Sequence, residues 1–319
     1  MIITRTPFRI TLGGGGTDLP AYYSRHGGFI FAAGLDKYMF VCLNTPIVDD
    51  LIRVKYSESE IVAEVEQVRH TLARQALMHF GIRSGVEIIS MADVPAGTGL
   101  GSSSCYLVGL LNGLHTLCRR PASRQTLAEE ACHIELDVLN KPIGKQDQYM
   151  AAFGGLTVLE IDRQGRVEAC QAGLEPDVVE DLESNILLFY TGLSRSTEEI
   201  LSSQIRRLAA EEAQVTDNLH RIQEIGREIL SQLRRGNTRR FGELLDEHWR
   251  AKKRLGDDVA GGRINELYEL ARANGAVGGK ISGAGGGGFF LFYAEEGKKQ
   301  LRAAMEAAGL REMRFRFDL

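Results

Sequence analysis

The stretch that decides the fold is PAGTGLGSSSC, which spans Pro95–Cys105. It follows a strand candidate at 85–91 and precedes a helix candidate at 103–117, in which leucines recur at helical intervals. The alternating glycines allow the backbone to turn its N–H groups inward. The start of the helix adds unpaired N–H groups and the positive end of a dipole. The segment therefore predicts an anion cradle that suits a polyphosphate.

This cradle is expected to use its glycine backbone together with serine hydroxyls, which also suit a helix cap or a Mg²⁺ ligand. It is not a Walker A loop, because the Gly-Lys-Ser/Thr ending is missing. The alternative is a glycine-rich turn with a serine cap and no ligand. The candidate phosphate-binding residues are Pro95, Gly97, Thr98, Gly99, Leu100, Gly101, Ser102, Ser103 and Ser104.

Glycine is clustered elsewhere too, since the chain has 36 glycines but only 7 prolines. LGGGGTDLP at Leu12–Pro20 predicts backbone packed against a small ligand, with the Asp18 carboxylate for its hydroxyl groups. GGKISGAGGGGFFLFY at Gly278–Tyr293 precedes an apolar strand and indicates that side chains are excluded there. Taken alone, each block fits a flexible loop or a crowded hairpin equally well. Likewise, Asp147 in NKPIGKQDQYMAAFGG, taken alone, is typical of a solvated turn.

Bulk properties limit the class of protein. A length of 319 residues exceeds the usual size of one core, so two domains are expected. The net charge of -4 and the isoelectric point near 6.0 argue against nucleic-acid binding. Five scattered cysteines without CxxC spacing suit a reducing compartment and predict no zinc site. With no long apolar run, we expect a cytoplasmic protein with no membrane partner.

Strand and helix candidates are mixed without a regular βαβ rhythm, which predicts an α+β protein in two lobes divided near residue 182. The expected strands lie at 2–4, 29–43, 51–56, 85–91, 156–161, 167–170, 186–191 and 313–317. The expected helices lie at 62–80, 103–117, 127–139, 197–233, 238–255, 262–273 and 298–308.

The order of these segments along nearly the whole chain resembles the GHMP kinases, named for galactokinase, homoserine kinase, mevalonate kinase and phosphomevalonate kinase. That family carries an N-terminal substrate motif, a P-x-G-x-G-L-[GS]-S-S loop, an acid in a G-x-x-D turn and a C-terminal G-A-G-G-G motif. The resemblance implies a ribosomal S5 domain 2-like N-terminal domain at 1–182, with the phosphate loop and the catalytic acid. It also implies a GHMP C-terminal α/β sandwich domain at 183–319, with ATP and Mg²⁺ as cofactors in a monomer or homodimer.

The first motif lacks the Glu-His pair of galactokinases and mevalonate kinases. Three segments, TPFRITLGGGGTDLPAYYSRHGG, GLDKYMFV and GKQDQYMAAFGG, resemble most the D-glycero-D-manno-heptose 7-phosphate kinases, relatives of fucokinase-type proteins. That resemblance implies phosphorylation of the anomeric hydroxyl to give the 1,7-bisphosphate, a precursor of nucleotide-activated heptose for bacterial surface polysaccharide. The alternatives are a kinase for free fucose or another hexose, and a non-catalytic sensor of ATP and sugar.

The resemblance also assigns roles to single residues. Asp147 matches the catalytic acid, and Arg9 matches an arginine that offsets phosphoryl charge. Ser103 matches a Mg²⁺ ligand, with Glu135 as its carboxylate partner. The expected substrate-binding residues are Gly15, Gly16, Thr17, Asp18, Arg195, Gly285 and Gly286.

A sugar phosphate would also need a basic pocket for its own phosphate. Arg195 is the preferred candidate, because it adjoins a glycine turn and a potential helix cap. Lys252 and Lys253 are further candidates, although a solvated helix face is the favoured interpretation of both. Trp249 and the seven histidines have no motif context and are interpreted as structural.

Overall fold

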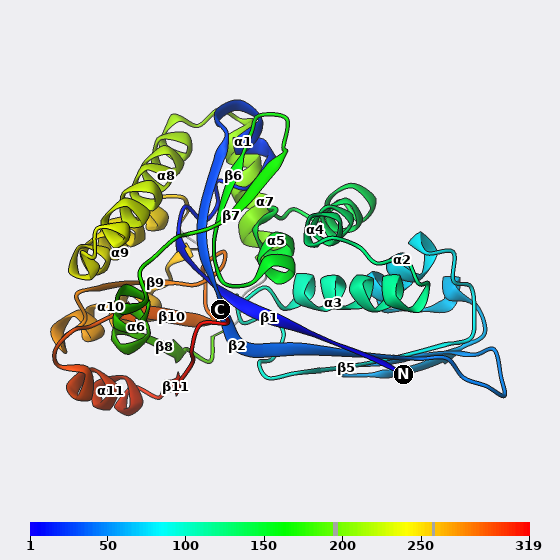
Figure 1. Cartoon of the computed structure of the whole chain (residues 1–319). Coiled ribbons are helices and arrows are strands. Elements are labelled where there is room, and N and C mark those ends of the chain that lie inside the picture. The colour runs from blue at the N-terminus through cyan, green and yellow to red at the C-terminus, as the bar shows by residue number, and fades with distance from the viewer. Residues whose placement is uncertain (194–196, 257–258) are drawn as a thin grey trace.

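The computed structural model describes residues 1–193, 197–256 and 259–319 (Figure 1). The strands β1–β7 form one sheet and the strands β8–β11 form a second. The strands are β1 (Ile2–Gly13), β2 (Gly28–Asn44), β3 (Ile52–Lys55), β4 (Ser59–Val62), β5 (Val86–Ala92), β6 (Leu156–Ile161), β7 (Val167–Gln171), β8 (Ile186–Tyr190), β9 (Gly278–Ile281), β10 (Phe289–Tyr293) and β11 (Arg311–Met313).

The helices pack on these sheets, and the connection after α4 continues as a π-helical turn. The helices are α1 (Pro20–His26), α2 (Thr71–His79), α3 (Ser102–Leu117), α4 (Arg124–Cys132), α5 (Gln146–Phe153), α6 (Pro176–Asn185), α7 (Thr197–Ala209), α8 (Ala213–Arg234), α9 (Thr238–Lys253), α10 (Gly262–Ala273) and α11 (Lys298–Ala307), with a 3₁₀ turn at Val65–Gln67 and the π-helical turn at His133–Val138. In the described part of the chain, no helix is long and apolar enough to cross a membrane. The mixture of sheets and helices confirms the predicted α+β class.

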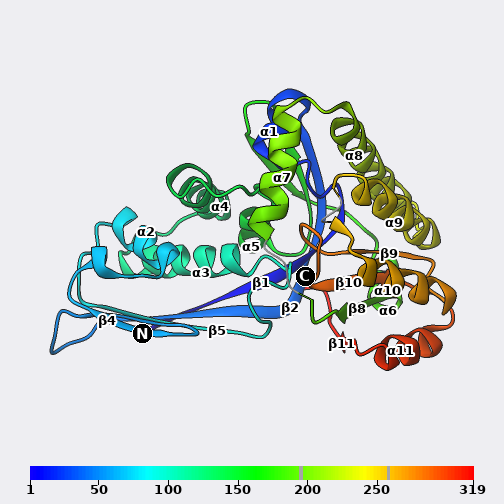
Figure 2. The same ribbon diagram turned by 180° about the vertical axis from the view of Figure 1, so that it is seen from behind.

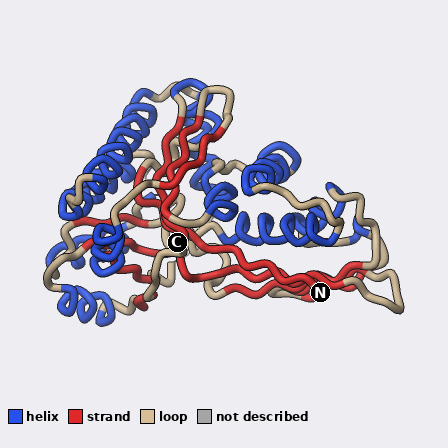
Figure 3. The backbone as a smooth tube through the Cα atoms, viewed as in Figure 1, coloured by secondary structure: helices blue, strands red, loops and turns tan. Residues whose placement is uncertain are grey.

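The long strand β2 organises the first sheet. One half of β2 pairs with β5 and the other half with β6, while β1 follows it along both halves. The register between β1 and β2 shifts between Pro7 and Arg9, and Figure 3 shows these strands bending along their length. Such irregularities re-aim side chains. Arg9 therefore lies where the sheet changes direction.

Helices α2, α3, α4 and α5 lie on one face of the first sheet (Figures 1 and 2). The leucines of α3 explain this placement, because Leu107, Leu110, Leu111 and Leu114 are all fully buried. A continuous apolar face of this kind fixes a helix on a sheet. The N-terminus of α3 is thereby held against β1, where the backbone N–H of Arg9 donates to the carbonyl of Leu100 in the preceding loop.

The two lobes share one hydrophobic core. A single cluster of buried side chains contains Phe8 of the first sheet together with Leu188 and Leu291 of the second. Helix α8 crosses β1 at a close approach, since a Cβ on Gly13 would lie 2.7 Å from the Cα of Gly226. Residue 182 lies within α6, which follows the last strand of the first sheet along the chain and precedes the first strand of the second. The domain division at this residue stays a prediction.

Several expected elements differ in the structure. The expected helix at 197–233 is two helices, α7 and α8, separated around Glu211, whose φ is +56°. Of the expected helix at 62–80, α2 forms the last part, Val65–Gln67 is a 3₁₀ turn, and Val62 belongs to the strand that pairs with β3. The expected last strand ends at Met313, and Phe317 forms an isolated bridge with Leu35. Helices α5 and α6 were not predicted.

Candidate active site

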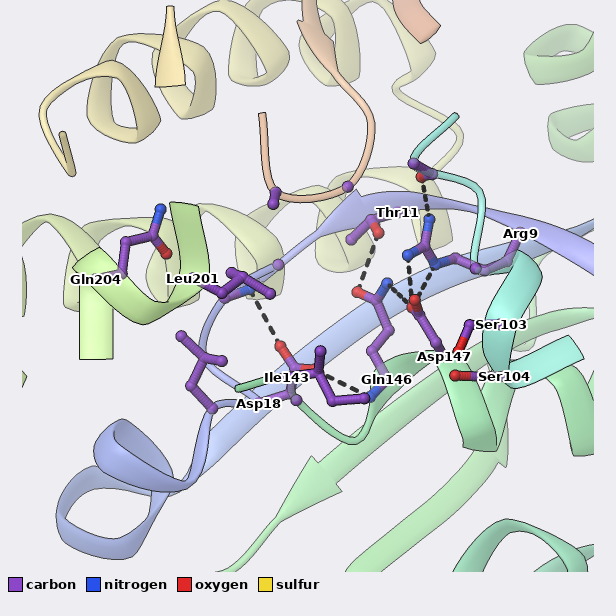
Figure 4. Close-up of a pocket in the computed structure, with 18 of the residues that line it drawn as sticks. Arg9, Thr11, Asp18, Ser103, Ser104, Ile143, Gln146, Asp147, Leu201 and Gln204 are labelled. Atoms are coloured by element: carbon purple, nitrogen blue, oxygen red, sulfur yellow. Dashed lines mark hydrogen bonds and ion pairs between the residues drawn. The ribbon is translucent and has the colours of Figure 1, made fainter. Parts of the chain in front are cut away.

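A pocket lies where several segments meet. They are β1, the loop at 95–101 before α3 (the phosphate loop), α5, α7, α9 and the glycine-rich turn between β9 and β10. Figure 4 shows Arg9 and Asp147 beside Ser103 and Ser104, with Asp18 on the other side of Gln146. The pocket thus draws on all four sequence segments and on both lobes. Of the predicted residues, its wall contains Arg9, Gly15, Gly16, Asp18, Gly97, Gly99, Gly101, Ser102, Ser103, Ser104, Glu135 and Asp147.

Arg9 and Asp147 form a tight ion pair at the centre of this wall. Arg9 donates from Nε (2.8 Å) and Nη2 (2.5 Å) to Oδ1 of Asp147, and Nη1 donates to the carbonyl of Gly99 at 2.7 Å. Gln146 Nε2 donates to the same Oδ1 at 3.1 Å. Asp147 also lies in the first turn of α5, where the helix dipole favours a negative charge. The carboxylate is therefore fixed in position through Oδ1, and Oδ2 is the oxygen left to accept a proton.

The phosphate loop has the geometry that its sequence predicts. Gly97, Gly99 and Gly101 have φ values of +77°, +76° and +85°, a region that L-residues with side chains rarely adopt. Gly101 is the N-cap of α3, so the first N–H groups of that helix belong to the serines that line the pocket. This end of the pocket can therefore bind an anion.

Three residues of the phosphate loop stabilise its backbone, through contacts within the loop and with β1. Thr98 Oγ1 donates to the carbonyl of Pro95 at 3.0 Å, and Thr98 is buried. The carbonyl of buried Leu100 accepts from the backbone N–H of Arg9 at 3.2 Å. Pro95, Thr98 and Leu100 therefore hold the loop shape, and phosphate contact by these three residues stays a prediction.

Oxygen ligands converge beside the loop at Glu135. Ser103 Oγ and Ser104 Oγ donate to its two carboxylate oxygens at 2.5 and 2.7 Å, and Gln148 donates at 2.8 Å. Lys141 Nζ lies 2.9 Å from Glu135 Oε1 and 3.2 Å from Ser103 Oγ. The Ser103 hydroxyl and the Glu135 carboxylate already contact the Lys141 amine, which is a cation. Such a pair of oxygens suits Mg²⁺, which takes few protein oxygens. Lys141 would have to move aside for such an ion.

Asp18 is held on the opposite side of the pocket by backbone N–H groups. Its Oδ2 accepts from Gln146 N at 3.0 Å and its Oδ1 from Gly16 N at 3.2 Å. Burial raises the pKa of Asp18 above its usual value, although these bonds oppose the shift. Gly144 packs so closely that a Cβ there would overlap the Asp18 carboxylate. Asp18 is thus fixed in a position where it can accept a ligand hydroxyl.

Known proteins share this architecture and these segments. The model of the GHMP kinases N terminal domain matches residues 63–155, and the model of the GHMP kinases C terminal domain matches residues 229–309. Together they match more than half of the chain. The chain belongs to the GHMP kinases.

Two curated relatives and one solved structure resemble this GHMP kinase over nearly its whole length. D-glycero-alpha-D-manno-heptose 7-phosphate kinase from Campylobacter jejuni is 27% identical, covering 93% of this chain and 91% of the relative. L-fucokinase/L-fucose-1-P guanylyltransferase from Bacteroides fragilis is 23% identical, covering 93% of this chain but only 35% of that protein. A D-glycero-D-manno-heptose 1-phosphate kinase structure from Bacteroides thetaiotaomicron has a TM-score of 0.79 at 24% identity, covering 99% and 96%, which shows the shared fold.

Some predicted substrate residues of this GHMP kinase do not line the described pocket. Thr17 is fully buried, and its hydroxyl donates to the carbonyls of Gly14 and Phe29 at 2.8 Å, so it fixes the loop. Gly285 and Gly286 pack against Val259. Their neighbours Gly283 and Ala284 line the pocket instead. The predicted residue Arg195 lies outside the described residues.

The pocket also contains basic residues that sequence reasoning misjudged. Lys252 is buried and lines the pocket, so its interpretation as part of a solvated face was wrong. His248 and Lys280, which received no functional role, line it as well. Lys253 lies elsewhere, near Asn265 and the Trp249 ring. The i, i+4 spacing puts His248 and Lys252 on one face of α9, but the sequence does not show that this face is buried.

Proposed function

We propose that this GHMP kinase transfers the γ-phosphoryl group of ATP to the anomeric hydroxyl of D-glycero-D-manno-heptose 7-phosphate, giving the 1,7-bisphosphate. The observation that carries the proposal is the Arg9–Asp147 pair beside the phosphate loop. A carboxylate that could act as a base and a guanidinium lie next to the loop proposed to bind polyphosphate, which supports this reaction. The heptose 7-phosphate kinase relative, similar over most of both chains, supports the choice of acceptor.

In this mechanism the loop and the N-terminus of α3 bind the ATP phosphates. The acceptor hydroxyl donates its proton to Oδ2 of Asp147 while its oxygen forms a bond to the γ-phosphorus. The bond from that phosphorus to the β–γ bridging oxygen breaks, and ADP leaves. Arg9 offsets the negative charge on the transferred group and keeps Asp147 oriented.

Ser103 and Glu135 are the residues that would hold Mg²⁺. A bound Mg²⁺ neutralises charge on the ATP phosphates and helps to orient them. Lys141, which contacts the same oxygens, is then free to contact a phosphate oxygen. Asp18, with Gly15 and Gly16, binds sugar hydroxyls on the other side of the pocket.

The product chemistry suggests the wider role. We place the enzyme in nucleotide-heptose synthesis for bacterial surface polysaccharide, and in the cytoplasm, where ATP is available. The five cysteines in the chain are all unpaired, which agrees with a reducing compartment. A monomer or a homodimer is expected.

A second candidate is a kinase for free fucose or another hexose. It is favoured by the similarity to part of the L-fucokinase/L-fucose-1-P guanylyltransferase. The same Asp147, Arg9 and phosphate loop would carry out this reaction. The two candidates differ in whether the acceptor brings a phosphate of its own.

The experiment is ATP consumption by the purified chain with Mg²⁺ and one acceptor at a time. The acceptors are heptose 7-phosphate, mannose 6-phosphate, mannose, fucose, galactose and mevalonate. We expect heptose 7-phosphate to give the highest kcat/KM. Preference for a free sugar would favour the second candidate. ATP binding without turnover of any acceptor would contradict both and favour a sensor.

A further inference from the structure

Three buried basic side chains form a cluster on the wall of the pocket. Lys252 and His248 come from successive turns of α9, and Lys280 comes from β9. Each is less than one-tenth exposed. Lys280 Nζ lies 3.4 Å from His248 Nε2, which joins the two elements. The cluster is therefore built by tertiary contact and not by one surface helix.

This cluster has no acidic partner among the described residues. Within residues 1–193, 197–256 and 259–319, the amine of Lys252 donates only to the carbonyls of Ile281 and Gly283. In the part of the chain that the structure describes, the side chain of Lys280 bonds to His248 alone, and Nδ1 of His248 is buried without a hydrogen-bond partner. A buried basic side chain is unfavourable in its charged form unless an opposite charge pairs with it, and an orphaned polar atom is unfavourable without a hydrogen-bond partner. Their retention in a pocket indicates a ligand that supplies the counter-charge.

Arg9 connects the cluster to the reaction centre. Burial is the main cause that lowers the pKa of Lys252 and Lys280; repulsion from Arg9 adds to it at Lys252, and repulsion from Lys252 and then Arg9 adds to it at Lys280. Arg9 itself is occupied by Asp147 and by Gly99. The other charged groups that share the pocket are Asp18, Glu135, Lys141 and Glu198. Positive groups thus crowd at one part of the wall, where an anion would lie close to the reacting atoms.

We propose that Lys252, Lys280 and His248 form a binding site for a substrate phosphoryl dianion, and that the site takes up protons when the dianion binds. This inference rests on the proposed function. The dianion has two sources, which are the phosphate of the acceptor sugar and the γ-phosphate of ATP. Both present the same chemistry to the cluster, namely several acceptor oxygens with negative charge.

Proton uptake follows from the burial of the amines. Burial, with a smaller effect of Arg9, lowers the pKa of Lys252 to about 7, so at pH 8 this amine is mostly neutral in the free protein. A nearby dianion favours the charged form and raises the pKa again. Binding at pH 8 therefore draws protons from the buffer.

The test is calorimetric titration of the full chain at pH 8 in two buffers that differ in ionisation enthalpy. The ligands are heptose 7-phosphate, the same heptose without phosphate, ATP, ADP and inorganic phosphate. We expect proton uptake with at least one ligand that carries a terminal phosphate. Lys280→Met is expected to reduce that uptake and to weaken binding roughly tenfold or more, whereas Lys253→Met, the matched control, changes neither.

The ligands separate the two sources. If the acceptor phosphate occupies the cluster, Lys280→Met weakens heptose 7-phosphate and leaves the unphosphorylated heptose unchanged. If the γ-phosphate occupies it, the variant weakens ATP and leaves ADP unchanged. Either result supports the site. Lys280→Gln provides a second variant, and thermal unfolding verifies that both variants fold.

Failure of the site and failure of the proposed function give different results. A chain that does not bind heptose 7-phosphate contradicts the proposed acceptor, while ATP and inorganic phosphate still report on the cluster. If both Lys280 variants fold, bind every phosphorylated ligand within twofold of the parent chain and take up the same number of protons, the inference is wrong.

Discussion

Gly144, which has no side chain, leaves the space in which the carboxylate of Asp18 lies. This carboxylate is held by two backbone N–H groups and lies directly against Gly144. The loop that carries Gly144 leads into α5, whose first turn contains Asp147. The spacing between the sugar-side carboxylate and the proposed base is therefore set by this short segment.

Gly144→Ala tests that arrangement. The added Cβ would overlap Oδ2 of Asp18, so the carboxylate must shift. We expect KM for the sugar to rise at least about tenfold, because hydrogen bonds to a charged group are lost, while KM for ATP stays near that of the parent chain. Steady-state kinetics with each substrate varied in turn gives both constants.

Gly262→Ala is the control, since a Cβ there meets nothing within 4 Å. It should leave both constants unchanged. Equal KM values for the sugar in Gly144→Ala and the parent chain would show that Asp18 does not bind the acceptor.

The buried amine of Lys252 predicts how stability depends on pH. Its pKa is about 7 in the folded protein against 10.5 for an ordinary lysine. Between these values the unfolded chain binds more protons than the folded chain, so the free energy of unfolding rises with pH. The contribution of one such group is at most about 1.4 kcal/mol per pH unit. Below pH 7 the amine is charged in both states and its unfavourable burial is fully present.

Lys252→Met should therefore flatten the rise in unfolding free energy between about pH 7 and pH 9. Urea unfolding in phosphate-free buffer at several pH values measures the slope. Lys253→Met, one residue along α9, should keep the slope of the parent chain. An unchanged slope in Lys252→Met would mean that the amine stays protonated when buried.

At the scale of elements, the second and third glycine-rich segments along the chain are brought together by close backbone contact. A Cβ on Gly283 would lie 2.9 Å from the Cα of Gly99, and a Cβ on Gly288 would overlap the carbonyl of Thr98. The turn after β9 therefore packs directly on the phosphate loop. Its glycines transmit the position of the second sheet to the site where ATP is proposed to bind.

Gly288→Ala should displace the phosphate loop. Both Gly288 and Gly309 have positive φ, +83° and +89°, but a Cβ on Gly309 meets nothing within 4 Å. Gly309→Ala should lose roughly 1–2 kcal/mol of stability from backbone strain alone. Gly288→Ala should lose more and also raise KM for ATP. Chemical unfolding and ATP kinetics distinguish the two, and equal effects in both variants would exclude a role for the loop contact.

Elements with strong periodic patterns were predictable from the sequence. The helix after Gly101 and the hairpin of β6 and β7 have local signals that burial then reinforces. The division between α7 and α8 has no glycine or proline to mark it, so a single helix was expected. Helix α5 is short and polar at its start, which is why Asp147 was read as a turn residue.

The site was predictable where backbone chemistry defines it. The loop glycines follow from their own sequence, whereas Asp147 and Arg9 were assigned only by the family resemblance, and the structure brings these residues together. Lys252 and Lys280 could not be placed, because their burial depends on α9 packing against β9. Charged residues on a helix usually face solvent, and only the tertiary contact reverses that expectation here.

At the scale of the whole molecule, the pocket exists only because the lobes are docked. Strand β1 contributes Arg9, α5 contributes Asp147, and α9 with the turn after β9 closes the opposite wall. The shared core of the two sheets fixes these walls relative to each other. Phosphoryl transfer mainly requires that the protein position the reacting groups and stabilise their charge.

The most direct test is phosphorus NMR of a reaction containing the chain, ATP, Mg²⁺ and heptose 7-phosphate. The account predicts a new phosphate signal coupled to the anomeric proton, which identifies the 1,7-bisphosphate. Asp147→Asn should slow its appearance by about 10²–10⁴-fold, whereas Asp137→Asn, an exposed aspartate outside the described pocket wall, should not. A phosphate on any other hydroxyl, or full activity in Asp147→Asn, would contradict the account.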